Sequence, residues 1–185
     1  MNIKGTAVHS VAEFIKKKYP DRYSDWLQAL PAESHKIFKG MILTSGWYTL
    51  HDGLTVPLRI SAKVFFSGNN EEAARTMGQF SANEALTGVY KFFVKLGSPK
   101  FLIERAGNLM STYFQPSEVR ISGIDKNKVT MLITKFPEPD EIIEWNIAGW
   151  IERALEVSGC SNVLVDIPKS LALGHPVTEF DITWS

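Results

Sequence analysis

The sequence predicts an α+β fold in which an N-terminal helical layer packs on a C-terminal four-stranded antiparallel β-β-α-β-β unit. Apolar residues recur with helical spacing up to about Phe114, and beyond that point they mainly alternate with polar residues, as in strands. A run of helices followed by an antiparallel set of strands is typical of the α+β class. The 185 residues fit one domain, 1–185, with a helical part over 1–115 and the β-β-α-β-β part over 116–185.

The helical part begins with a short extended segment over 3–8. Ser10 and Glu13 match the capping-box pattern, which predicts the start of a first helix that Pro20 ends. The segment 41–48 is ambiguous and is predicted as loop or short extended chain. Periodic apolar residues and Gly, Pro and Asn signals predict the further helices at 23–30, 32–39, 49–66, 70–96 and 99–113.

The longest predicted helix starts at Asn70, which we interpret as its N-cap, and runs to Leu96. Small residues form a stripe along it, so another helix could lie unusually close to this side. The stripe consists of Gly78, Ala82, Ala85 and Gly88.

The C-terminal part begins after Pro116 with two alternating runs around the turn 125–127, which predicts a β-hairpin. A helix over 140–158 with Gly159 as its C-cap comes next. Two further strands are predicted at 163–167 and 180–184.

The helix over 140–158 carries two apolar faces. The broad face should cover the sheet, and it holds Ile143, Ile147, Trp150, Ile151, Ala154 and Leu155. The second patch consists of Ile142, Trp145 and Gly149. A helix that lies on a sheet needs only one such face, so the second patch should meet the N-terminal helices, a ligand or a partner chain.

Composition excludes several classes of function. Twenty basic residues balance twenty acidic ones, so the chain lacks the positive field of a nucleic-acid binder and the charge of a membrane-surface protein. The single Cys160 cannot form an internal disulfide, and no signal peptide or transmembrane run is visible. We expect a cytoplasmic protein that does not insert into a membrane.

Motifs of catalysis and metal binding are missing from the sequence. There is no phosphate loop and no nucleophile elbow, so no catalytic residue is predicted and an enzyme is not expected. No metal site is expected, because the histidines are isolated in the sequence: His9, His35, His51 and His175. The neighbouring residues His51 and Asp52 should point apart on a helix. The acidic cluster is interpreted as helix capping, and Cys160 as a buried, inert thiol; the cluster consists of Glu138, Asp140, Glu141 and Glu144.

The run KFPEPDEIIEWNIAGWIERALEVSGCSNV and the later TEFDITW resemble an uncharacterised bacterial family first noted as paralogues in myxobacteria. That resemblance covers essentially the whole chain. The family is itself similar in topology, chiefly over 70–185, to the superfamily of heme nitric-oxide-binding domains, vinyl-reductase-type ligand domains and TRAPP vesicle-tethering subunits. The resemblance implies a bacterial protein that binds heme, another small molecule or a protein.

A heme domain of this superfamily carries a proximal histidine on the helix before the first hairpin strand, and a Tyr-x-Ser-x-Arg motif for the heme propionates. The corresponding helix here, 99–113, contains no histidine, and Tyr113, Ser117 and Arg120 have the wrong spacing. A heme iron needs an axial ligand. We therefore expect no cofactor, with heme disfavoured.

Aromatic residues indicate a ligand pocket between the helical layer and the sheet, where Arg105 could be a polar anchor. The candidate aromatic residues are Trp47, Tyr48, Phe93, Phe101, Tyr113, Trp145 and Trp150. The sequence thus predicts a non-enzymatic ligand-binding or sensory module that holds an apolar small molecule. The alternative is a protein-interaction domain, for dimerisation or as a scaffold, that binds no ligand and uses the second apolar patch as a homodimer interface.

Overall fold

A computed structural model describes residues 1–87, 103 and 105–185. The N-terminal elements are β1 (Asn2–Lys4), α1 (Gly5–Lys18), the short 3-10 turn η1 (Pro20–Arg22), α2 (Tyr23–Ala29), α3 (Ala32–Lys39), β2 (Trp47–Thr49), the π-helical turn η2 (His51–Thr55), α4 (Val56–Phe65) and α5 (Asn70–Thr87). The C-terminal elements are α8 (Ala106–Tyr113), β3 (Phe114–Gln115), β4 (Glu118–Asp125), β5 (Lys128–Lys135), α9 (Glu141–Val157), β6 (Leu164–Lys169) and β7 (Thr178–Thr183). The predicted α+β class and the order of its two parts are confirmed.

The first helix starts earlier than its capping signal predicts. Helix α1 begins at Gly5, and the Ser10 hydroxyl lies inside it and donates to the Ala7 carbonyl oxygen. The capping-box interpretation of Ser10 and Glu13 is therefore wrong. An early start is possible because Gly5 has no side chain: a Cβ there would lie 2.0 Å from the carbonyl oxygen of Leu43.

Strand β1 lies at the centre of a small antiparallel sheet in the order β2-β1-β3. Its central residue Ile3 pairs with Tyr48 of β2 and with Phe114 of β3, and its side chain is fully buried. This sheet was not predicted, because strands of two or three residues are too short to show a period. It ties the N-terminus to both parts of the chain.

The second sheet is antiparallel in the order β4-β5-β7-β6, as the alternating runs predict. The hairpin β4–β5 turns after Asp125, which pairs with Lys128. In the centre of the sheet Val129 lies opposite Ile182 and Met131 opposite Phe180, and all four side chains are buried. One face of this sheet therefore belongs to the core.

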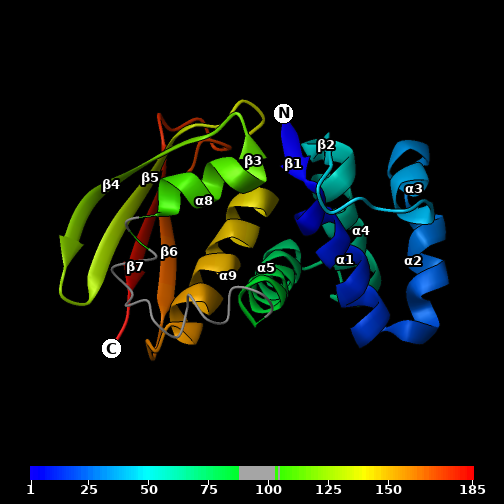
Figure 1. The fold of residues 1–185 in the computed structure, drawn as a ribbon, viewed down its shortest axis with the longest axis horizontal. Coiled ribbons are helices and arrows are strands. Elements are labelled where there is room, and N and C mark those ends of the chain that lie inside the picture. The colour runs from blue at the N-terminus through cyan, green and yellow to red at the C-terminus, as the bar shows by residue number, and fades with distance from the viewer. Residues whose placement is uncertain (88–102, 104) are drawn as a thin grey trace.

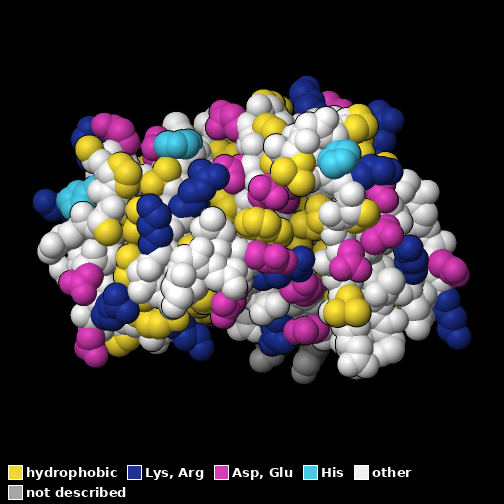
Figure 2. Space-filling view, turned by 180° about the vertical axis from the view of Figure 1, so that it is seen from behind, with side chains coloured by type: hydrophobic (Ala, Val, Ile, Leu, Met, Phe, Trp, Pro, Cys, Tyr) yellow, Lys and Arg dark blue, Asp and Glu magenta, His cyan; other side chains and the backbone are white. Residues whose placement is uncertain are grey.

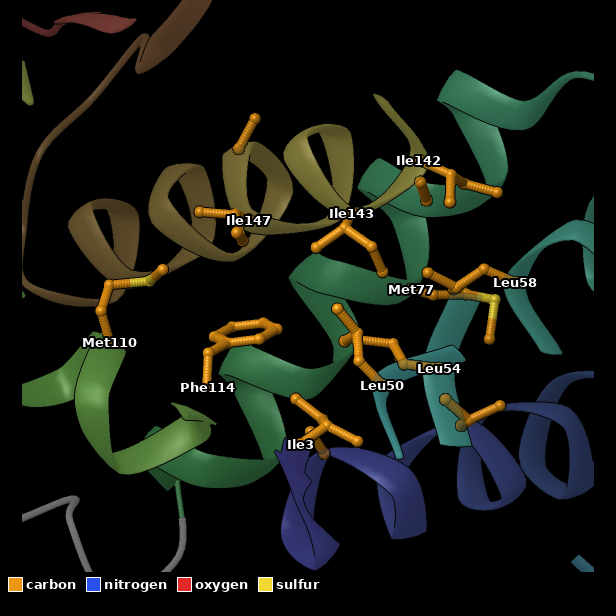
Figure 3. Close-up of a cluster of buried hydrophobic side chains, with 14 of the residues drawn as sticks. Ile3, Leu50, Leu54, Leu58, Met77, Met110, Phe114, Ile142, Ile143 and Ile147 are labelled. Atoms are coloured by element: carbon orange, nitrogen blue, oxygen red, sulfur yellow. The ribbon is translucent and has the colours of Figure 1, made fainter. Parts of the chain in front are cut away.

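Helix α9 separates the two parts of the molecule (Figure 1). One of its sides faces the four-stranded sheet and α8, and the other lies against α5, behind which α1 and α4 follow. Asp140 is its N-cap, because the carboxylate accepts a hydrogen bond from the Ile142 backbone N–H at 3.0 Å. Gly159 ends the helix at φ 104°, a conformation that glycine adopts without strain. Figure 3 shows Ile143 of α9 facing Leu50, Ile3 and Phe114, so one apolar core joins both parts.

The N-cap of α5 also differs from the prediction. The side-chain oxygen of Asn69 accepts a hydrogen bond from the Glu72 backbone N–H, so Asn69 is the cap and Asn70 is the first helical residue. The predicted end of this helix at Leu96 and the predicted restart at Pro99 lie outside the described residues.

Candidate ligand-binding site

An apolar cavity of about 100 Å³ lies between α8, α9 and the inner face of the four-stranded sheet. Helix α9 contributes its broad apolar face to one wall, and Met110 of α8 and Met131 of β5 contribute to others. Ala7 of α1, Leu54 of η2 and Ser81 of α5 reach the cavity from the N-terminal part. The site is thus built from both parts of the chain.

The lining of the cavity combines small and large side chains. Ala154 on α9 and Ala106 on α8 both line it. The ring of Tyr113 lies 6.2 Å from that of Trp150, centroid to centroid, and both border the cavity. An apolar lining of this kind favours an apolar guest.

The structure brings together only some of the predicted pocket residues. Tyr113 and Trp150 line the cavity. Trp145 is half-buried and packs on the core without lining it, whereas Phe93 and Phe101 lie outside the described residues. Arg105 directly precedes α8 as its N-cap residue and does not line the cavity either.

Trp47 and Tyr48 lie elsewhere, on β2 beside the start of α1. The ammonium group of Lys4 lies 4.7 Å from the centre of the Trp47 ring, and the Tyr48 hydroxyl accepts a hydrogen bond from the Leu43 backbone N–H at 2.8 Å. Tyr48 thus contacts the segment that precedes β2, whereas Trp47 contacts β1. They do not line the cavity.

Sequence reasoning missed two polar residues of the cavity, Ser81 and Asn146. The Asn146 amide donates to the Ala74 carbonyl oxygen of α5 at 3.0 Å, so this polar group is satisfied by the helix crossing. The available signal was the polar residue within the apolar run of α9. Ser81 belongs to the same face of α5 as the small-residue stripe and could have been found from it.

A polar hollow of about 210 Å³ adjoins the apolar cavity. Ser81 and Tyr113 line both, so they form the boundary between them. Helix α1 supplies Thr6, His9, Ser10 and Glu13 to the hollow, and α5 supplies Glu84. An apolar space thus opens next to a group of hydroxyl, imidazole and carboxylate side chains.

Glu144 departs from its predicted role in capping. This carboxylate is buried and accepts hydrogen bonds from the Ser170 hydroxyl at 2.5 Å, the Thr178 hydroxyl and, at 3.4 Å, the Ala172 backbone N–H. His175 contacts only backbone atoms of Ser170, so the Ser–His–acid order of a hydrolytic triad is not formed. The cluster fastens the β6–β7 connection to α9.

Other expectations about reactive groups have mixed outcomes. His51 and Asp52 do meet, with Nδ1 and Oδ1 2.9 Å apart, which corrects the prediction that they point apart. The hydrogen bond with His51 and a second one from Thr49 lower the pKa of the Asp52 carboxyl against the opposing effect of burial. Cys160 is a free, buried thiol whose pKa is raised by burial, as an inert cysteine requires.

Acidic and basic side chains are intermixed on the face that Figure 2 shows, in line with the zero net charge. Within the described part of the chain, no group of three or more His, Cys, Asp or Glu side chains is placed to hold a metal ion. Among the described helices, none combines the length and apolar character needed to cross a membrane.

Solved structures of H-NOX (heme nitric-oxide-binding) proteins share this fold over nearly the whole chain. The Fe(II) unliganded protein from K. algicida is 12% identical with a TM-score of 0.72, covering 99% of this chain and 97% of its own. The S. oneidensis protein in the Fe(II)NO state is 12% identical with a TM-score of 0.74, and 99% of each chain is covered. The Shewanella woodyi protein in the Fe(II)CO state is 15% identical with a TM-score of 0.69, over 98% and 94%. No family model and no curated sequence matches.

These neighbours confirm the predicted similarity to the heme nitric-oxide-binding superfamily at the level of the fold. They also contradict our expectation that the chain takes no cofactor and that heme is disfavoured. Proteins described by the ligation state of their Fe(II) have the same architecture from end to end. A missing histidine and a missing motif in one predicted helix were too narrow a basis for that conclusion.

Proposed function

We propose that this protein is a ligand-binding sensory domain and that its ligand occupies the apolar cavity between α8, α9 and the sheet. The observation that supports this proposal is the cavity itself, because its walls come from both parts of the chain. A ligand there would change the packing of α9 on its sheet side and could thereby alter the rest of the fold. Tyr113 and Trp150 are the two predicted pocket residues that we propose to contact it.

Heme is the first ligand to test, because the structural neighbours are H-NOX proteins. The described residues do not fit a histidine-ligated heme as they stand. No histidine is among the described lining residues, and about 100 Å³ is below the roughly 300–1,000 Å³ of pockets for drug-sized ligands. Met110 and Tyr113 line the cavity and are of residue types that can hold heme iron.

The second apolar patch on α9 does not favour the alternative function as a homodimer. Gly149 packs directly on the backbone of Arg75 in α5, and Ile142 is buried. This patch therefore contacts the N-terminal helices, which was one of the three predicted possibilities. We therefore base the proposal on the cavity.

Filling the cavity tests the proposal. In Ala106→Leu the larger side chain should occupy the cavity, raise the free energy of unfolding by about 1 kcal/mol and weaken ligand binding about tenfold. The probes are toluene, followed by ligand-observed NMR, and hemin, followed by its absorption spectrum. Toluene is chosen because small aromatic molecules bind in apolar cavities, as benzene does in one of ~150 Å³ in another protein.

Ala29→Leu is the matched control, because Ala29 is exposed at the end of α2. This variant should bind both probes like the unmodified protein. The proposal is wrong if neither toluene nor hemin binds, or if both bind Ala106→Leu as tightly as they bind the unmodified chain.

A further inference from the structure

The apolar cavity and the polar hollow share a boundary, and this arrangement has a chemical consequence. A molecule that passes between Ser81 and Tyr113 has an apolar environment at one end and hydrogen-bonding groups at the other. Burying a polar group in the apolar cavity alone would cost it its hydrogen bonds with water. The combined space therefore selects a molecule with one apolar and one polar end.

The charges around the hollow indicate the kind of polar end. Glu13 and Glu84 face it from α1 and α5, and each carboxylate also has a lysine partner outside the lining. Lys16 lies 3.4 Å from Glu13, and Lys17 lies 2.9 Å from Glu84, and both lysine side chains are about half exposed. Exposed pairs of this kind are weak, so a bound cation can compete with the lysines for the carboxylates.

His9 is the third ionisable group of the hollow. Its Nε2 lies 4.0 Å from a Glu13 carboxylate oxygen, one helical turn along α1. The hydroxyl groups of Thr6 and Ser10 complete this side, and the Ser10 hydroxyl already donates to the Ala7 carbonyl oxygen. These groups can accept hydrogen bonds from a donor that enters between α1 and α5.

We infer that the ligand of this domain is a small amphipathic amine, with its apolar part in the cavity and its ammonium group in the polar hollow beside Glu13 and Glu84. The inference rests on the proposed function, because it uses the same cavity for the apolar part. It adds the chemical class of the ligand and a second group of contact residues. An anionic head would meet two carboxylates and no lysine or arginine among the described lining residues, so it would bind more weakly.

A series of probes with the same phenyl ring separates the two claims. Toluene, benzyl alcohol, benzylamine and phenylacetate are titrated into the protein and followed by ligand-observed NMR. We expect benzylamine to bind about fivefold more tightly than benzyl alcohol, the ratio that ~1 kcal/mol gives, and phenylacetate to bind most weakly. If toluene binds and benzylamine has no advantage, only the amine inference fails. If toluene does not bind, the cavity proposal fails for this class of ligand.

The double variant Glu13→Gln/Glu84→Gln tests the role of the carboxylates. It should remove the advantage of benzylamine and leave the affinity for toluene unchanged, because toluene does not reach the hollow. Glu33→Gln is the control, since Glu33 is an exposed residue of α3 that does not line the hollow. A preference for benzylamine that persists in the double variant would overturn the inference, and so would its loss in Glu33→Gln.

Discussion

The two sides of helix α9 differ in how closely they pack. On the side of α5, Gly149 and Gly78 let the backbones touch: a Cβ on Gly149 would lie 2.2 Å from the Arg75 carbonyl oxygen, and one on Gly78 would lie 2.1 Å from that of Asn146. On the side of α8 and the sheet, Ile147 and Ile151 instead border an open cavity. Helix α9 therefore packs closely on one side and borders an unfilled space on the other.

Polar contacts hold α5 and α9 together on the closely packed side of α9. Arg75 of α5 binds Glu152 of α9 and the Val165 carbonyl oxygen, and Gln79 donates to the same Glu152 at 2.9 Å. The guanidinium group of Arg153 donates a hydrogen bond to the side-chain oxygen of Asn83 at 2.9 Å. These contacts hold α5 and α9 together as a pair.

The largest expected effect on stability comes from the close contact between α5 and α9. Gly149→Ala places a methyl group against the Arg75 backbone. Backbone atoms cannot move aside as the end of a flexible side chain could. We expect the free energy of unfolding to fall by about 3 kcal/mol, measured by urea denaturation. In an unobstructed helix the same change stabilises by about 1 kcal/mol, so the sign alone decides whether the close contact exists.

Gly123→Ala is the control, because nothing lies within 4 Å of the position a Cβ would take there. The free energy of unfolding of this variant should lie within about 0.5 kcal/mol of that of the unmodified protein. Equal stability of the two variants would show that α5 and α9 are not in close contact.

The sequence predicted the close side better than the open one. The stripe that includes Gly78 is a local pattern that indicated a close helix contact. The second patch of α9, which includes Gly149, is also local and indicated a contact with the N-terminal helices, a ligand or a partner chain. The cavity depends on where α8 and the sheet meet α9, which no local pattern encodes. Trp145 and Trp47 were chosen as large aromatics, yet the described walls also consist of aliphatic side chains such as Ile147 and Met131.

The polar cluster of Glu144 could not be predicted for a related reason. Its partners Ser170 and Thr178 are 26 and 34 residues further along the chain, and only the packing of the β6–β7 connection brings them together. Near the start of a helix, an acidic residue is normally explained by the helix dipole. That explanation holds for Asp140 and not for Glu144.

Glu144→Gln tests whether this cluster fastens the sheet side of α9 at one end. The amide has one acceptor oxygen and presents donors to the hydroxyl groups that now donate to the carboxylate. We expect a loss of about 2 kcal/mol in the free energy of unfolding, measured by urea denaturation. Glu156→Gln, at an exposed position near the end of α9, should change it by less than about 0.5 kcal/mol. Similar losses in both variants would mean that the buried hydrogen bonds contribute nothing specific.

The smallest expected effect concerns the outer face of the four-stranded sheet. This face is polar, whereas the inner face borders the cavity. The Thr130 hydroxyl donates to Asp181 at 2.8 Å and Lys128 lies 3.1 Å from it. The hydrogen bond from Thr130 is the main cause that lowers the pKa of the Asp181 carboxyl below 3.8, and Lys128 adds to it against the effect of burial. A lowered folded-state pKa contributes stability that is present above the unfolded-state pKa and is lost as the pH falls through the folded-state value.

Asp181→Asn should therefore cost about 0.5 kcal/mol near neutral pH, and the difference from the unmodified protein should shrink as the pH falls below 3.8. Urea denaturation at a series of pH values measures this difference. Binding of toluene should not change, because Asp181 does not line the cavity, whereas its neighbour Ile182 does. A pH-independent difference would show that the ionised carboxylate of Asp181 does not contribute the stability. A change in toluene affinity would show that the outer face of the sheet is coupled to the cavity.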